Sequence, residues 1–87
     1  MLLHNEQISL AAKLLQLSVS DIESNSELIE SNGALYVSIP IKGGDSLIVA
    51  QDGTVLYADS SVGYNRHLLE FESGKRTPAE SFKSVDS

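Results

Sequence analysis

The sequence predicts an α+β domain in two layers, with an N-terminal helix, a four-stranded antiparallel meander over residues 28–59 and a C-terminal helix. The main observation is that turn signals at 32–33, 42–45 and 52–53 separate four short apolar runs. Asn-Gly and Asp-Gly favour type I′ hairpin turns, because both central residues of such a turn have positive φ. Strands joined by turns this short pair with their neighbours in chain order. Apolar residues at helical spacing on both sides of the meander predict the two helices.

A capped and periodic segment near the N-terminus predicts the first helix. Asn5 is a suitable N-cap. Four apolar residues then recur at helical spacing: Ile8, Ala11, Ala12 and Leu15. A second capping pattern begins at Ser20, and the polar residues after it allow one turn of helix. The following segment, 27–31, is either the first strand of the meander or a continuation of the helix that begins at Ser20.

The turns also predict how the strands pair. The first two-residue turn places Ser31 opposite Ala34, and this fixes the pairing of the first two strands. The last two-residue turn places Val49 opposite Leu56. Between them, a four-residue loop keeps Pro40, which has no N–H, out of the hydrogen-bonding positions.

This register predicts one core face and one mixed face of the sheet. The core face holds Leu28, Leu35, Val37, Ile39, Ile41, Ile48, Ala50, Val55 and Tyr57. Both helices are expected to cover this face. The other face is apolar around four residues that the helices then leave uncovered: Tyr36, Leu47, Val49 and Leu56. Contiguous exposed apolar area marks contact surfaces, so these four residues are the predicted partner-binding site.

The last helix is predicted over residues 62–73. Gly74 suits the C′ position, and Ser60 or Ser61 is expected to cap the N-terminus. Three apolar residues share one side of this helix: Tyr64, Leu68 and Phe71.

The chain has room for one small domain, which we place at residues 1–76. Residues 77–87 are predicted to form a short helix or a frayed tail. Alternatively, Phe82 and Val85 bring this tail back over the mixed sheet face. The sequence shows no leader-like or membrane-spanning apolar segment and no cysteine, so we expect a cytoplasmic protein without a disulfide scaffold.

The charge of the chain argues against a nucleic-acid partner. Its formal net charge is −6, and the clustered Lys and Arg that nucleic-acid binding requires are missing from the sequence. Two interpretations of this charge remain open. It attracts a basic protein surface, because complementary charge speeds the encounter, or it serves solubility alone, since net charges of this size are ordinary for small domains.

The sequence offers little catalytic chemistry. His67 and Glu70 lie three residues apart on the last helix, but a stable metal site needs three or four ligands, and His67 is expected to be solvated or half-buried. Residues 59–63 lack both the phosphate-loop pattern and the nucleophile-elbow pattern. We therefore predict no enzyme activity, no cofactor and no metal.

The hairpin at 47–56, the Ser-rich loop after it, and the segment 68–71 with Gly74 resemble the end of small bacterial immunity proteins of the YrhB type. The resemblance covers about a third of the chain. It implies a cytosolic protein that neutralises a toxin by binding it, without chemistry of its own. The alternative is a self-associating domain, such as a homodimer closed through the mixed sheet face.

Overall fold

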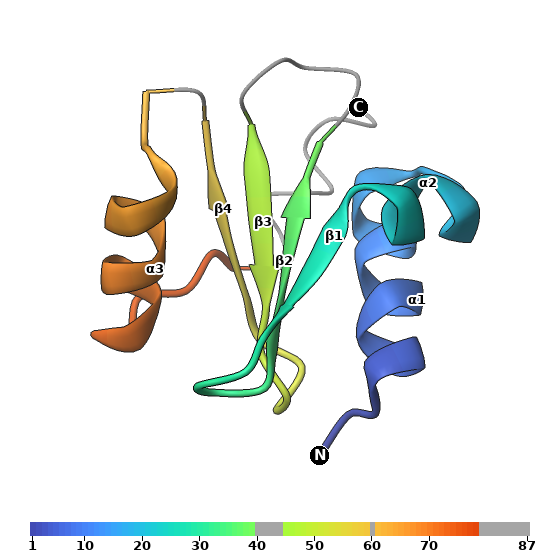
Figure 1. The fold of residues 1–87 in the computed structure, drawn as a ribbon, viewed down its shortest axis with the longest axis horizontal. Coiled ribbons are helices and arrows are strands. Elements are labelled where there is room, and N and C mark those ends of the chain that lie inside the picture. The colour runs from blue at the N-terminus through green and yellow to red at the C-terminus, as the bar shows by residue number, and fades with distance from the viewer. Residues whose placement is uncertain (40–44, 60, 79–87) are drawn as a thin grey trace.

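The computed structural model describes residues 1–39, 45–59 and 61–78, and it confirms the predicted fold class. The elements follow in the order α1 (His4–Leu15), α2 (Val19–Ser24), β1 (Ser26–Ile29), β2 (Ala34–Ser38), β3 (Ser46–Val49), β4 (Val55–Ala58) and α3 (Tyr64–Glu72). The strands form one antiparallel sheet in chain order, as the turns predict (Figure 1). Of the segment 27–31, which the sequence left open between strand and helix, residues 27–29 belong to β1 and the last two lie in the following turn.

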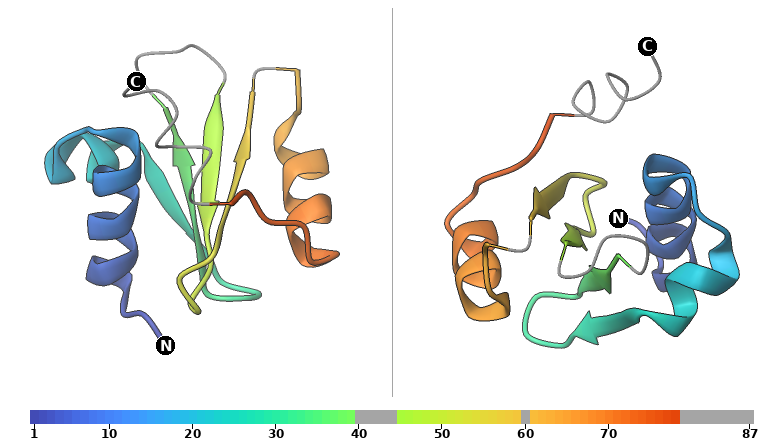
Figure 2. Two further views of the ribbon diagram at one scale, coloured as in Figure 1. Left: turned by 180° about the vertical axis from the view of Figure 1, so that it is seen from behind. Right: turned by 90° about the horizontal axis from the view of Figure 1, so that it is seen from above.

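The prediction of two layers is wrong, because the helices lie on opposite faces of the sheet (Figure 1 and Figure 2). On one face, here called the α1 face, α1 and α2 pack through Ile8 and Ile22. On the other, the α3 face, Phe71 packs against Ile48 and Leu56. Both faces of the sheet are apolar, so each needs a helix to exclude water.

Both sheet faces are apolar because β3 is turned over relative to the predicted register. Val37 pairs with Leu47, which puts Val37 and Ile48 on opposite faces. The predicted loop at 42–45 would have placed Val37 opposite Ala50, so β3 is displaced by three residues along β2. On its other side β3 is displaced by one residue, and Val49 pairs with Val55. A shift by an odd number of residues exchanges the two faces of a strand, and two such shifts cancel. Thus β4 keeps its predicted orientation and β3 alone is reversed.

Turn length explains both shifts. Between β3 and β4, the N–H of Ala50 donates to the carbonyl oxygen of Thr54 at 2.8 Å, so the turn holds three residues. Of the Asp52-Gly53 pair only Gly53 has positive φ, at 90°, whereas a type I′ turn needs two such residues. Between β2 and β3, pairing extends to Ile39, whose N–H donates to Asp45 at 2.9 Å. The expected loop at 42–45 and Pro40 otherwise lie outside the described residues.

The turn between β1 and β2 is two residues longer than predicted. Ile29 pairs with Ala34, which leaves four residues in the turn. The side-chain oxygen of Asn32 accepts from the N–H of Ala34 at 2.9 Å, and Gly33 has a φ of 71°. A shift of two residues preserves the faces, so Leu28 lies on its predicted face, opposite Leu35.

The two N-terminal helices begin at other caps than predicted. Helix α1 starts one residue before Asn5, and the N–H of its N-cap residue Leu3 donates to the carboxylate of Glu6 at 2.8 Å. Helix α2 is capped by Ser18 rather than Ser20. The described helices include none that is long and apolar enough to cross a lipid bilayer.

Helix α3 lacks the predicted serine cap. Its N-cap is Gly63, without a side-chain hydrogen bond, and the N–H of Ser61 instead donates to the carboxylate of Asp59 at 3.0 Å. At the other end Gly74 has a φ of 104°, which fits its predicted place after the helix.

The chain remains attached to the sheet beyond residue 76. The N–H of Thr77 donates to Val55 at 2.7 Å, and its hydroxyl accepts from the N–H of Tyr57 at 2.9 Å. These bonds engage the outer edge of β4. The rest of the predicted tail, from residue 79 on, lies outside the described residues.

Candidate functional site

The four residues of the predicted partner-binding site do not form one exposed surface. Leu47 and Val49 are fully buried on the α1 face. Leu56 is buried beneath α3 on the other face, and half-buried Tyr36 packs beside it. The reversal of β3 places Leu47 and Val49 on the face opposite to Tyr36 and Leu56. Helix α3 covers the sheet face that was expected to be exposed.

The imidazole of His67 is fully buried, contrary to the prediction of a solvated or half-buried side chain. Its Nε2 lies 2.8 Å from the carbonyl oxygen of Leu56, and its Nδ1 lies 2.9 Å from the hydroxyl of Ser46. Because a carbonyl only accepts, Nε2 carries the proton, and the Ser46 hydroxyl donates to Nδ1. Burial lowers the pKa of His67, which favours this neutral form.

A serine beside a histidine is the pair that nucleophilic catalysis uses. Here both side chains lie between α3 and the sheet, and Ser46 is only 2% exposed. Neither lines any of the three hollows described below. What the arrangement does is join α3 to β3 and β4. Within the described part of the chain, no three His, Cys, Asp or Glu side chains gather in a way that could hold a metal ion.

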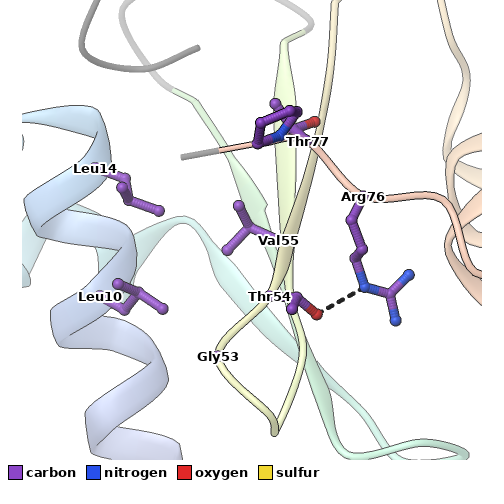
Figure 3. Close-up of a pocket in the computed structure, with 8 residues that line it drawn as sticks. Leu10, Leu14, Gly53, Thr54, Val55, Arg76 and Thr77 are labelled. Atoms are coloured by element: carbon purple, nitrogen blue, oxygen red, sulfur yellow. Dashed lines mark hydrogen bonds between the residues drawn. The ribbon is translucent and has the colours of Figure 1, made fainter. Parts of the chain in front are cut away.

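The first hollow is an apolar groove between α1 and β4, with a volume of about 390 Å³. Leu10 and Leu14 of α1 point across it toward Val55 (Figure 3). Arg76 points away from α1, because its Nε donates to the hydroxyl of Thr54 at 2.8 Å and its guanidinium lies 3.9 Å above the centre of the Phe71 ring. The groove therefore offers apolar contacts to a ligand, and the guanidinium of Arg76 is already engaged elsewhere.

Among the described residues, none pairs with the outer edge of β1, whereas Thr77 bonds to the outer edge of β4. The N–H of Ser38 donates to the carbonyl oxygen of Asn25 at 2.8 Å, so the odd-numbered residues of β1 bond to β2. Hydrogen-bonding directions alternate along an antiparallel strand, and the N–H and C=O groups of Ser26 and Leu28 therefore point away from the sheet. Within the described part of the chain, no backbone group bonds to them. The Leu28 side chain is 44% exposed at this edge.

A hollow lies beside this edge on each face of the sheet. On the α1 face, a hollow of about 340 Å³ is lined by His4, Ile8, Glu23, Ser26 and Leu28. On the α3 face, a hollow of about 520 Å³ is lined by Ser24, Asn25, Ser26, Glu27, Tyr36, Ser38 and Tyr64. Helix α1 packs mainly over β2 and β3, and the edge strand has a hollow on each of its faces.

The surface around this edge is acidic. Four exposed carboxylates come from α2, β1 and the start of the next turn: Asp21, Glu23, Glu27 and Glu30. The segment 19–30 contains no Lys or Arg. The ion pairs among the described residues all involve Glu70 on α3, so none of the four carboxylates is neutralised by a neighbouring cation of the described chain.

We call the outward groups of Ser26 and Leu28, the two flanking hollows and the four carboxylates the β1-edge site. The sequence contained a signal for it, since the first strand of a meander in chain order lies at an edge of the sheet. The acidic composition of the segment 19–30 was also visible in the sequence. The prediction missed the site because it assigned Leu28 to the core.

No family model, curated protein or solved structure matches this chain, so the resemblance to immunity proteins of the YrhB type stays a prediction.

Proposed function

We propose that this chain is a protein-binding module that adds an extended segment of its partner to the sheet as a fifth strand beside β1. The observation that carries the proposal is the uncovered edge at which Ser26 and Leu28 direct their backbone groups outward. Unpaired N–H and C=O groups in a row are a template for another strand, and domains that bind peptides by strand addition use such an edge.

The backbone groups alone supply a modest part of the affinity. Two N–H and two C=O groups make four hydrogen bonds, and at about 0.5–1.5 kcal/mol net each they contribute about 2–6 kcal/mol. Association costs about 4–15 kcal/mol in lost translational and rotational freedom, which equals or exceeds the contribution of these hydrogen bonds. Side-chain contacts must supply the remainder. The hollows on both faces beside β1 provide room for them.

We propose that the module acts without catalysis, because the contact between Ser46 and His67 that most resembles catalytic machinery is covered by α3. The resemblance to immunity proteins suggests a more specific role, neutralisation of a bacterial toxin domain in the cytoplasm. A basic toxin surface is the partner that the acidic β1-edge site fits best.

Self-association, the alternative, has no observation in its favour. The sheet face that was expected to close a homodimer is occupied by α3. Pairing two copies through β1 would bring both sets of carboxylates together, and like charges on an edge strand are a common device against such pairing.

The experiment is a selection of short random peptides against the wild-type protein and against Leu28→Pro. The N–H of Leu28 points outward, so proline removes a donor from the open edge without breaking a bond to β2. Leu28→Ala is the matched control, because it shortens the same side chain and keeps the N–H. We expect enriched peptides to bind wild type, to bind Leu28→Ala more weakly because an apolar contact is lost, to protect the amides of Ser26 and Leu28 from hydrogen exchange, and to lose binding to Leu28→Pro.

Peptides that bind Leu28→Pro as tightly as Leu28→Ala would contradict strand addition. A stable dimer in light scattering, with the Ser26 and Leu28 amides still exchanging rapidly, would also contradict it and favour self-association.

A further inference from the structure

We infer that the segment bound at the β1-edge site alternates apolar and basic side chains, with the apolar ones on the α1 face and the basic ones on the α3 face. This inference rests on the proposed strand addition and adds the chemistry of the partner. Successive side chains of a strand point to opposite faces, so each hollow would contact every second residue of the incoming segment. The residues opposite Leu28 and Ser26 lie on the α1 face, and the residue between them, opposite Glu27, lies on the α3 face.

The hollow on the α3 face suits a cation. Glu27 is exposed there and pairs across the strands with Tyr36. The rings of Tyr36 and Tyr64 meet edge to face, with their centres 4.7 Å apart, and Tyr64 is 43% exposed. A guanidinium stacks on aromatic rings and forms paired hydrogen bonds with a carboxylate. Arginine therefore matches the chemistry of this hollow better than an acidic or apolar side chain does.

The hollow on the α1 face offers an apolar wall next to the edge strand. Ile8 and Leu28 line it together with the polar side chains of His4, Glu23 and Ser26, and Leu28, which is 44% exposed, lies at the edge itself. A Val, Ile or Leu of the bound segment would cover Leu28 and remove apolar surface from water. The central pattern of the segment is thus apolar, basic, apolar.

The charge around β1 decides between a foreign segment and a second copy of this chain. A second β1 brings its own Glu27, and nearby Asp21, Glu23 and Glu30 repel their counterparts. A basic segment is attracted to the same four carboxylates, which also speeds its approach. The occupant is therefore a basic segment of another protein.

The test uses four synthetic peptides with blocked ends and equal length. In the first, valine alternates with arginine; in the second, with threonine; in the third, with glutamate. The fourth has the composition of the first, with its valines and arginines in two separate blocks. Binding to the isotope-labelled full chain is measured by titration calorimetry, and the perturbed amides are located by NMR.

We expect the valine–arginine peptide to bind with the largest shifts at the amides of Ser26 and Leu28, and at least about tenfold more tightly than the block peptide, because only the alternating order places each side chain in its hollow. Glu27→Gln should weaken this binding about tenfold, since it removes one charge-assisted contact. Glu72→Gln is the matched control. It removes the same charge from an exposed position on α3 that does not line the hollow, and it should leave binding unchanged.

The outcomes separate the inference from the proposed function. If the valine–threonine peptide binds at β1 as tightly as the valine–arginine peptide and Glu27→Gln has no effect, strand addition stands and the basic pattern is refuted. If the block peptide binds equally well, or Glu72→Gln weakens binding as much as Glu27→Gln, the attraction is diffuse and the inference is refuted. If none of the peptides shifts the Ser26 and Leu28 amides, strand addition itself is refuted.

Discussion

Neighbouring core residues of β3 provide a direct test of the three-layer arrangement. Leu47 and Ile48 are adjacent in sequence and both are fully buried, but Leu47 packs under α1 and Ile48 under α3. Replacing either by alanine removes three side-chain carbons. At about 0.8 kcal/mol per buried carbon the transfer loss is about 2.4 kcal/mol, and the remaining cavity raises the total to about 2–5 kcal/mol. We expect Leu47→Ala and Ile48→Ala to lower the free energy of unfolding by similar amounts within this range.

The free energies are measured by urea denaturation followed by circular dichroism. A domain of this length has about 4–13 kcal/mol of stability, at about 0.05–0.15 kcal/mol per residue, so an alanine variant can unfold outright. The milder Ile48→Val, with an expected loss of about 0.5–1.5 kcal/mol, keeps the experiment informative in that case. Leu69→Ala is the control, because Leu69 is 68% exposed on α3 and should change stability by less than about 0.5 kcal/mol. A large loss at Leu47 together with a loss at Ile48 no greater than the control would refute the placement of α3 over the second face.

Three further predictions concern individual groups. Burial lowers the pKa of His67 below its usual 6.5, so the unfolded chain takes up a proton that the folded chain does not, and stability should fall as the pH drops below about 6.5. In His67→Gln this part of the pH dependence should vanish. If the free energy of unfolding, measured by urea denaturation between pH 7.5 and 5, changed with pH equally in both proteins, the prediction would be contradicted. The hydrogen bond from Tyr57 to the carboxylate of Asp45 raises the pKa of Tyr57 to about 12, so one tyrosine should ionise well above the usual 10 in an ultraviolet titration, and stability should decline as the pH rises from 10 toward 12. Tyr57→Phe should abolish that late step, and a wild-type titration without it would show that the bond does not form. Gly53→Ala should destabilise the protein by about 1–2 kcal/mol, because Gly53 has a φ of 90° and the added Cβ meets no atom within 4 Å that could compensate for the strain; an unchanged urea midpoint would refute this.

The amino-acid sequence by itself determined the order of the elements and the kind of each except β1, which it left open between strand and helix. Helix α1 follows from the spacing of Ile8, Ala11 and Ala12, and the end of α3 follows from Gly74, because these signals act within one or two turns of the chain. The meander order also follows locally, since short turns leave adjacent strands no other neighbour. Together these signals were sufficient for the fold class.

Tertiary structure decided which face each residue of β3 occupies. A turn that is one residue longer or shorter exchanges the faces of a whole strand, and turn dipeptides do not specify length that closely. The Asp52-Gly53 pair lies in a three-residue turn where two were predicted, and this shift together with the shifted pairing of β2 and β3 places Leu47 on the α1 face. The side of the sheet on which α3 packs then follows from the apolar surface around Ile48, which exists only with the correct register.

The candidate site depends on the same distinction. That β1 is an edge strand, and that its segment is acidic, can be derived from the sequence, because both follow from chain order and composition. That Leu28 is exposed and that Tyr36 and Tyr64 meet beside Glu27 depends on where α1 and α3 lie across the sheet. The burial of His67 likewise requires α3 to pack against β3 and β4. Such contacts join residues far apart in the chain, and the local patterns that specify helices and turns carry no information about them.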